Sequence, residues 1–141
     1  MVANHDNMLL TFDTCNMEYF EGKLLFPQFG LLHSYRTCGY FQYTKGGWFD
    51  KTLYDPTISI TDYFDFTEKQ FVDIMVHEMI HYYLACFGID RGCHHGKKFM
   101  ELAERLNNKY HLNVSKRLDI SQYKRVKGPL LSYWLANNLG I

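Results

Sequence analysis

Two histidines and a glutamate stand in an H-E-x-x-H arrangement at His77-Glu78-Met79-Ile80-His81. In an α-helix four residues advance the chain by about 400° and ~6 Å, so both histidines would project from one face. Two neutral imidazole nitrogens placed in this way suit a single zinc ion. The residue beside the first histidine can then reach a water molecule on that ion. The motif therefore predicts a zinc site in which Glu78 is the catalytic base.

The residues before and after this motif predict that it lies on a helix. Thr67-Glu68-Lys69-Gln70 is a capping box in sequence, with Thr at the N-cap and Gln three residues later. A long apolar stretch follows and stops at Gly88. We therefore expect a helix from Glu68 to about Phe87, with Met79 and Ile80 as ordinary core residues.

A third protein ligand must come from elsewhere in the chain, because the motif supplies only two. In one subclass of H-E-x-x-H proteins a third histidine follows shortly after the motif, but here that position is Phe87, which excludes the subclass. Glu101 lies twenty residues after His81, a separation similar to that in thermolysin-like enzymes. On a helix whose apolar stripe contains Phe99, however, Glu101 would face about 200° away from that stripe and from the core.

Three further side chains are candidates for the third ligand. Cys38 could be an upstream thiolate ligand, but the residues around it do not match the motif of the peptide deformylases. His94 and His95 lie in a polar turn, residues 91–96, that leads from the expected helix into the next one. A loop between two packed helices can return a side chain to the metal, so both histidines remain candidates for the third ligand.

Hydrophobic periodicity predicts two more helices. Apolar side chains recur at helical spacing near the start, and we expect a helix from about Asn4 to Phe20 with Gly22 as its C-terminal cap. Another helix should begin near Gly96, where an apolar stripe follows a 3.6-residue period. Its members are Phe99, Leu102, Ala103, Leu106 and Tyr110. Further on, residues 113–120 could be extended, and a short packing helix is expected from Pro129 through Leu139.

Short runs of β-type sequence lie between the first two expected helices. They cover residues 30–36, 39–45 and 57–61, and they are punctuated by Pro27, Lys45-Gly46-Gly47 and Asp55-Pro56. A short, mainly antiparallel, three-stranded sheet accounts for them best. Together with the helices, this predicts an α+β fold.

Length and composition favour a single domain. A chain of 141 residues with 47% hydrophobic and 17% aromatic residues can bury one sizeable core. We expect one domain over residues 1–141, with its core at about 5–110 and a basic extension at 111–141. No apolar run reaches the ~18 residues that span a bilayer, and the N-terminus lacks signal-peptide features. We therefore expect a monomeric cytoplasmic protein without membrane contact, its four cysteines reduced and mostly buried.

Charge is balanced overall but unevenly distributed along the chain. Residues 1–90 hold five basic and 12 acidic side chains, a balance of −7, whereas residues 91–141 hold ten and three, a balance of +7. A basic C-terminal third permits a weak DNA contact, although a solvated face is the commoner reason for such a pattern.

Several motifs together resemble those of the SprT-like, or Spartan-type, zinc metallopeptidases. The H-E-x-x-H motif followed by His95-Gly96-x-x-Phe99 is similar to the H-E-M-x-H and H-G-x-x-F pair of that family. Supporting similarities cover about residues 5 to 110. They are Asn16-x-x-Tyr19-Phe20-x-Gly22-x-Leu24, Ser34-x-Arg36, Gly39 and Ile58-Ser59-Ile60.

The resemblance implies a small zincin-like metallopeptidase domain that binds one zinc ion per chain. By motif position, the ligands are His77, His81 and His95, and Glu78 is the catalytic base. His94 then becomes a polar loop residue. Many relatives follow this core with a cysteine-rich zinc ribbon, but this chain has no cysteine after Cys93, so no role of that ribbon is carried over.

Two functions compete. The first is a zinc-dependent endopeptidase that hydrolyses peptide bonds by Glu-assisted attack of zinc-bound water on a protein or peptide substrate. Eukaryotic relatives suggest DNA-associated proteins as substrates, and an edge strand at Thr57 to Thr61 would hold the substrate extended. The alternative is a nucleic-acid-associated binding module with a structural or vestigial zinc site, supported by the basic stretch from Lys109 to Lys127. Glu78 would have no purpose in that alternative.

Overall fold

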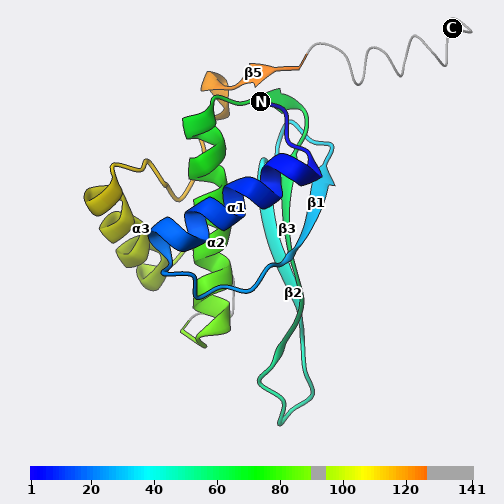
Figure 1. The fold of residues 1–141 in the computed structure, drawn as a ribbon, viewed down its shortest axis with the longest axis vertical. Coiled ribbons are helices and arrows are strands. Elements are labelled where there is room, and N and C mark those ends of the chain that lie inside the picture. Colours follow the sequence, from blue (N-terminus) through cyan, green and yellow to red (C-terminus); the bar gives the residue numbers. More distant parts are fainter. Residues whose placement is uncertain (90–94, 127–141) are drawn as a thin grey trace, which may run out of the picture.

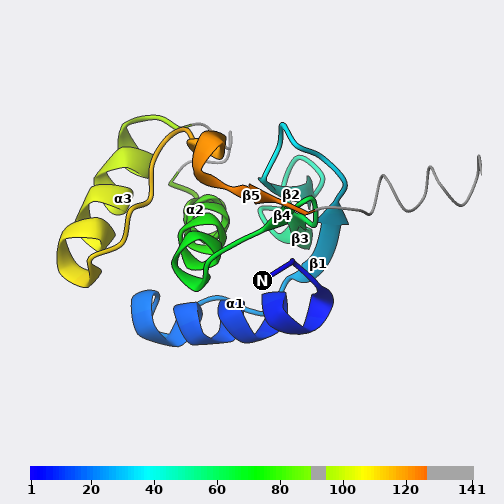
Figure 2. The same cartoon turned by 90° about the horizontal axis from the view of Figure 1, so that it is seen from above.

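Helix α2 lies at the centre of the fold, and the other elements pack around it (Figure 1). The computed structural model describes residues 1–89 and 95–126. The elements are α1 (His5–Tyr19), β1 (Gln28–Leu32), β2 (Gly39–Lys45), β3 (Leu53–Thr61), β4 (Phe64–Asp65), α2 (Glu68–Cys86), α3 (Lys97–Tyr110), a 3-10 turn η1 (Ile120–Gln122) and β5 (Lys124–Arg125). Seen from above, α2 stands between α3 and the sheet, and α1 crosses alongside (Figure 2). The predicted α+β fold class is confirmed.

Local signals define both ends of α2. The Thr67 hydroxyl accepts a hydrogen bond from the Gln70 N–H at 3.1 Å, and the Gln70 side chain accepts one from the Thr67 N–H at 2.9 Å. At the other end Gly88 has φ of +67°, and the Ile89 N–H donates to the Leu84 carbonyl at 2.9 Å. That bond is typical of a Schellman motif. Because both caps are local, the sequence predicts the helix to within one residue.

Asn16 ties α1 to the segment that leads into the sheet. Its Nδ2 donates to the Leu24 carbonyl at 2.8 Å, and its Oδ1 accepts from the Leu24 N–H at 3.1 Å. Gly22, with φ of +69°, donates its N–H to the Asn16 carbonyl at 2.9 Å. The helix itself has Asn4 as N-cap and Phe20 as C-cap, the two residues predicted to bound it.

Helix α3 begins directly after Gly96, as predicted, and its apolar stripe faces inward. The buried members are Phe99, Leu102, Ala103 and Leu106, and Tyr110 is half-buried. After the helix, residues 113–119 form neither helix nor strand, so the extended segment considered for residues 113–120 is not part of a sheet. The predicted helix from Pro129 to Leu139 lies outside the described residues.

Strand β3 is the centre of the three-stranded sheet. It pairs with β1 in parallel, from Gln28 opposite Thr57 to Leu32 opposite Thr61, and with β2 antiparallel. The prediction that Thr57 to Thr61 forms an edge strand is therefore wrong, because its main chain is hydrogen-bonded on both sides. Strands β4 and β5 form a second, antiparallel pair, so two of the three pairings among the described strands are antiparallel.

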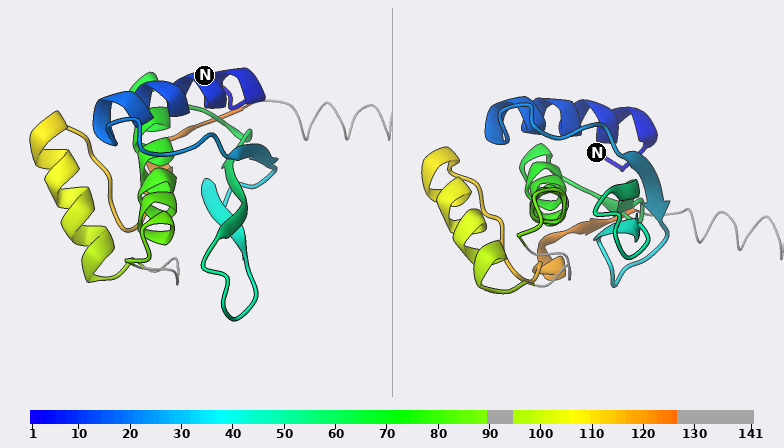
Figure 3. Two further views of the ribbon diagram at one scale, coloured as in Figure 1. Left: turned by 60° about the horizontal axis from the view of Figure 1, so that its bottom comes forward. Right: turned by 90° about the horizontal axis from the view of Figure 1, so that it is seen from below.

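Asp55 and Pro56 do not separate two strands, although the sequence suggested that they would. They lie inside β3, where Asp55 has φ of +49° and the register with β2 shifts between Gln42 and Thr44. Proline has no N–H to donate to a ladder, and such a bulge is one of the few places in a sheet that accepts it. Beyond the bulge, the hairpin of β2 and β3 continues past the helices (Figure 3).

The core lies where α2 meets the sheet, α1 and α3. Among its fully buried side chains are Phe12 of α1, Ile58 and Ile60 of β3, and Phe71 and Met79 of α2. Burial of each such side chain stabilises the fold by about 1.5–3 kcal/mol. Within the described residues, no helix combines the length and the apolar character needed to cross a membrane.

Candidate metal centre

Three histidines meet between α2 and the start of α3. His77 and His81 lie one helical turn apart on α2, and each has only 6% of its surface exposed. His95 directly precedes Gly96, the N-cap residue of α3. The Nε2 atom of His95 lies 2.9 Å from Nε2 of His77 and 3.1 Å from Nε2 of His81. The helical spacing of His77 and His81 and the position of His95 just before α3 therefore bring these three side chains together.

The distances between these nitrogens fit a shared cation. One ligand atom from each histidine lies within 4.8 Å of the other two, which makes the three side chains close enough to bind one metal ion. Two nitrogens bound tetrahedrally to one zinc ion at ~2.0–2.1 Å would be about 3.3 Å apart. Imidazole suits zinc among other divalent metals, so the donor set fits this ion.

The hydrogen bond to Ser115 fixes the orientation of His77. Its Nδ1 lies 2.8 Å from the Ser115 carbonyl oxygen, which can only accept, so Nδ1 carries the proton and Nε2 faces the other histidines with a lone pair. Burial, followed by the electrostatic effect of the neighbouring His95, lowers the pKa of His77 to about 4, although the Ser115 hydrogen bond acts in the opposite direction. His77 is therefore neutral at physiological pH, the state in which histidine binds metals.

The ring of Phe99 packs against all three histidines of the cluster. Its ring centroid lies 4.8 Å from that of His77, 4.7 Å from that of His81 and 5.0 Å from that of His95. The side chain is fully buried. The sequence assigned Phe99 to the core stripe of α3; in the structure its ring also contacts the rings of all three histidines.

Glu78 lies beside the cluster but is not one of its three members. Its carboxylate Oε1 is 4.0 Å from Nε2 of His77, and only 4% of the residue is exposed. Burial raises the pKa of Glu78 to about 8. Because His77 is neutral, its contact with Glu78 is not an ion pair. The carboxyl group of Glu78 lies close enough to the cluster to exchange a proton with a molecule bound beside the histidines.

Gly39 is a residue of the site to which the sequence assigned no role. A Cβ atom at this position would lie 2.7 Å from Oε1 of Glu78, a separation that real Cβ atoms do not reach. The start of β2 can therefore approach the carboxylate only because residue 39 has no side chain. In the sequence, Gly39 is only one of the residues that carry the family resemblance, because no local pattern reveals a contact between distant elements.

A cleft opens next to Glu78. It has a volume of about 320 Å³ and is lined by His77 and Glu78, by residues 36–39 before and at the start of β2, and by the segment after α3. The contributing residues of that segment are Lys116, Arg117, Leu118 and Ile120. A ligand in this cleft would therefore contact both the proposed base and one of the clustered histidines.

Of the other residues considered as ligands, neither Cys38 nor Glu101 belongs to the cluster. Cys38 is buried on the wall of the cleft, and burial raises the pKa of its thiol to about 11, which disfavours the thiolate that a metal needs. Glu101 is half-exposed on α3 and forms ion pairs with Lys97 and Lys98. His94 lies outside the described residues.

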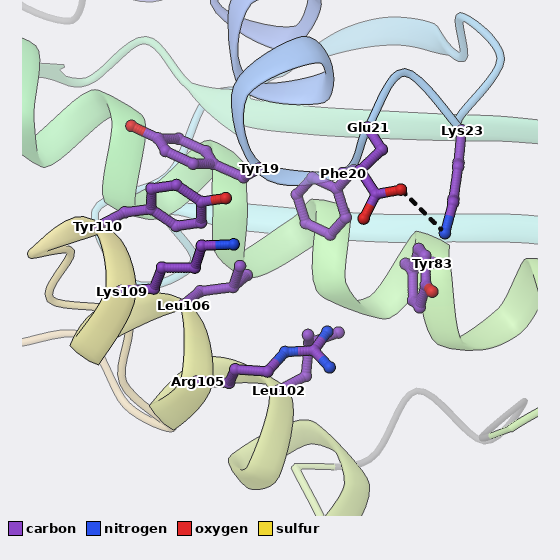
Figure 4. A pocket seen from close by; sticks show the side chains of 10 residues that line it. All are labelled: Tyr19, Phe20, Glu21, Lys23, Tyr83, Leu102, Arg105, Leu106, Lys109 and Tyr110. Carbon is purple, nitrogen blue, oxygen red and sulfur yellow. Dashed lines mark ion pairs between the residues drawn. The ribbon is translucent and has the colours of Figure 1, made fainter.

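A second cavity, of about 310 Å³, lies between the C-terminal ends of α1 and α3 and beside Tyr83 of α2 (Figure 4). It shares no lining residue with the cleft beside Glu78. Two of the basic side chains that line it have partners within the cavity wall. Lys23 pairs with Glu21 at 3.5 Å. Lys109 lies 5.2 Å from the ring centroid of Tyr110, at a helix C-terminus where positive charge is favourable. This cavity contains none of the histidines.

Comparison with protein families agrees with the geometry. The model of the SprT-like family matches residues 9–123, which contain most of α1, the three-stranded sheet, the histidine cluster, Glu78 and the residues that line the cleft. No curated protein matches the chain.

Proposed function

Since this chain belongs to the SprT-like family, we propose that it is a zinc-dependent endopeptidase. In this proposal His77, His81 and His95 hold the metal and Glu78 is the general base. The observation that carries it is the convergence of the three Nε2 atoms, at 2.9 and 3.1 Å, with a buried carboxylate 4.0 Å from the first of them.

The number of ligands favours a catalytic role over a purely structural one. Among the described residues, the group of potential ligands has three members, whereas a structural zinc site normally has four. When bound in such a site, zinc lowers the pKa of a coordinated water to ~7 and polarises a carbonyl. The alternative, a nucleic-acid-associated module with a vestigial metal site, gives no reason for a buried Glu78 at the wall of an open cleft.

Glu78 has the surroundings of a group that accepts and returns a proton. Burial disfavours the charged form of Glu78 and raises its pKa to about 8, which strengthens the affinity of the carboxylate for a proton taken from water. Gly39 keeps the space beside Oε1 free of a side chain. We infer that Glu78 takes a proton from the attacking water and gives it to the leaving amine.

Strand β2 is the part of the sheet available to an extended substrate. Among the described strands it lies at one edge of the sheet, and its first residue, Gly39, lines the cleft with Glu78. The central strand β3 cannot serve, because both of its sides are paired. A peptide added along β2 would form main-chain hydrogen bonds and would pass the proposed base.

The direct test is hydrolysis of an unfolded protein by the zinc-loaded chain and by Glu78→Gln. We expect the variant to bind zinc as well as the wild type and to lose at least about 100-fold in rate, because an amide of nearly the same shape cannot act as a base. Glu104→Gln is the matched control, since Glu104 is exposed on α3 outside the cleft lining. Equal rates for Glu78→Gln and the wild type would refute the mechanism.

A further inference from the structure

Three basic side chains line the same cleft as His77 and Glu78. They are Arg36, Lys116 and Arg117, which we call the cationic rim. All three are exposed, and within residues 1–89 and 95–126 none of them forms an ion pair. Among the described residues, Glu78 is the only carboxylate in the lining. The cleft therefore has an excess of positive charge that the described part of the protein does not neutralise.

The wall that carries Arg36 is held firmly against the sheet. The N–H groups of Arg36 and Thr37 both donate to the Ser34 hydroxyl oxygen at 3.0 Å. The Ser34 N–H in turn donates to the Thr61 hydroxyl at 3.2 Å, at the end of the central strand β3. Arg36 thus extends from a hydrogen-bonded turn, which holds its main chain in place at the cleft.

The opposite wall is tied to α2 directly before Lys116 and Arg117. The Ser115 carbonyl accepts the hydrogen bond from Nδ1 of His77 at 2.8 Å. Two residues earlier, the Asn113 N–H donates to the buried carboxylate of Asp73 at 3.0 Å. The segment that carries the two cations is therefore positioned by the same helix that carries the proposed base.

The nearest acidic residue in the sequence does not neutralise the cationic rim. Asp119 accepts hydrogen bonds from the Ser121 N–H at 3.1 Å, from the Ser121 hydroxyl at 2.6 Å and from the Gln122 side chain at 3.4 Å. These bonds lower its pKa and turn the carboxylate toward η1. Asp119 is also absent from the lining of the cleft.

We propose that the cationic rim is a binding subsite for an acidic side chain of the substrate, so that peptide bonds flanked by Asp or Glu are cleaved preferentially. The proposal rests on the proposed peptidase function. Cations held on both walls of one cleft attract a carboxylate that enters it and repel a lysine or arginine. We favour an acidic peptide over a nucleic-acid backbone, because the same cleft is lined by Glu78, the proposed base that must reach the peptide bond to be cleaved.

The test uses a set of synthetic peptides that differ at one position. Each has an otherwise uncharged sequence, and Asp, Ala or Lys is placed in turn at every position on both sides of the cleaved bond. We expect kcat/KM of the zinc-loaded protein to be about 10-fold higher for Asp than for Lys at one or more positions. This ratio should shrink as ionic strength rises, because salt screens exposed charges.

Charge reversal identifies the residues responsible. In the double variant Lys116→Glu with Arg117→Glu, we expect the Asp-over-Lys preference to disappear or reverse. The double variant Arg105→Glu with Lys109→Glu is the matched control: it makes the same change of charge at exposed positions of α3 outside the cleft, and it should keep the preference. Thermal unfolding of both variants shows whether the fold is intact, and Arg36→Gln tests the other wall if the double variant does not fold.

The possible outcomes separate the two proposals. If the alanine peptide is cleaved and Glu78→Gln abolishes that cleavage, the peptidase function stands; equal rates for Asp and Lys peptides would then overturn the acidic subsite alone. If no peptide is cleaved by the wild type, both proposals fail. A third outcome is that Asp and Lys peptides are cleaved equally and that a DNA oligonucleotide inhibits both reactions in the wild type but not in Lys116→Glu with Arg117→Glu. In that case the cationic rim binds phosphates, and the acidic-peptide proposal is wrong.

Discussion

Gly39 at the start of β2 and Glu78 in the middle of α2 are 39 positions apart in the sequence, yet the strand passes so close to the helix that a Cβ atom on Gly39 would lie 2.7 Å from Oε1 of Glu78. The backbone of β2 thus forms the wall against which the carboxylate rests. A side chain at residue 39 would have to displace the carboxylate or the strand.

We predict that Gly39→Ala reduces peptide hydrolysis without removing the metal. The added methyl group should move the Glu78 carboxylate, and a misplacement of about 1 Å can reduce the rate by ~10²-fold. Gly47→Ala is the control, because a Cβ atom there meets nothing within 4 Å. Measurements of kcat/KM and of bound zinc check the prediction; a variant with wild-type activity would show that the contact is not needed for catalysis.

We predict one zinc ion per chain and its loss in His95→Ala. The variant removes the nitrogen that lies 2.9 and 3.1 Å from the other two, so metal analysis should find little zinc after dialysis. In the wild type, added zinc should raise the unfolding temperature, since a ligand that binds only the folded state stabilises it. This rise should be absent in His95→Ala.

His94→Ala is the control for the zinc prediction, because His94 is the neighbouring histidine that the sequence left as an alternative. It should keep its zinc. The reverse result, with zinc lost in His94→Ala and kept in His95→Ala, would reject the assignment of the third ligand.

The thiols should differ in reactivity according to burial. Burial raises the pKa of Cys15 to about 12, with the charges of Glu18 and Asp73 acting in the same direction, and burial raises that of Cys38 to about 11, whereas Cys86 is exposed. In the native protein at pH ~8, iodoacetamide should therefore modify Cys86 well before the two buried thiols.

Peptide mass spectrometry identifies each modified cysteine, and the unfolded protein is the control in which all should react. Because the two buried thiols ionise more easily in the unfolded chain, they also contribute stability below pH ~9 that is lost as pH rises through their folded pKa values. Rapid native modification of Cys38 would contradict its burial.

The helices could be predicted because their signals are local. The order of the strands could not, because it depends on pairing between residues far apart in the sequence. The capping box at Thr67 and the glycine at 88 lie within a few residues of the ends that they define, so α2 could be predicted from the sequence. Whether residues 57–61 lie at an edge or in the centre depends on pairing with β1, which precedes them by some thirty positions. Thr57–Thr61 was therefore assigned to the wrong place.

The site shows the same division. The helical period places His77 and His81 on one face, so this pair could be predicted from residue spacing. His95 lies outside the helices, just before α3, and only the resemblance to a family singled it out over His94. The role of Gly39 and the cationic rim depend on elements that meet only in the folded chain, and no period or motif in the sequence reveals such contacts.

We expect at most weak DNA binding by the basic C-terminal third. Two of its cations are already engaged: Lys124 lies 4.0 Å from the Asp65 carboxylate, and the Arg125 guanidinium lies 4.6 Å from the ring centroid of Tyr35. The +7 balance of residues 91–141 is also offset by −7 in residues 1–90. Few phosphates can therefore be neutralised at once.

A salt titration of binding to single- and double-stranded DNA measures this contact. Each neutralised phosphate contributes about −0.9 to the slope of log K against log salt on duplex DNA and about −0.7 on single strands, so a shallow slope is expected. The variant Lys124→Ala with Arg125→Ala should change it little, as should the control Lys97→Ala with Lys98→Ala on α3. Submicromolar binding at physiological salt that disappears only in the first variant would contradict the prediction and would make DNA-bound proteins the leading substrate class.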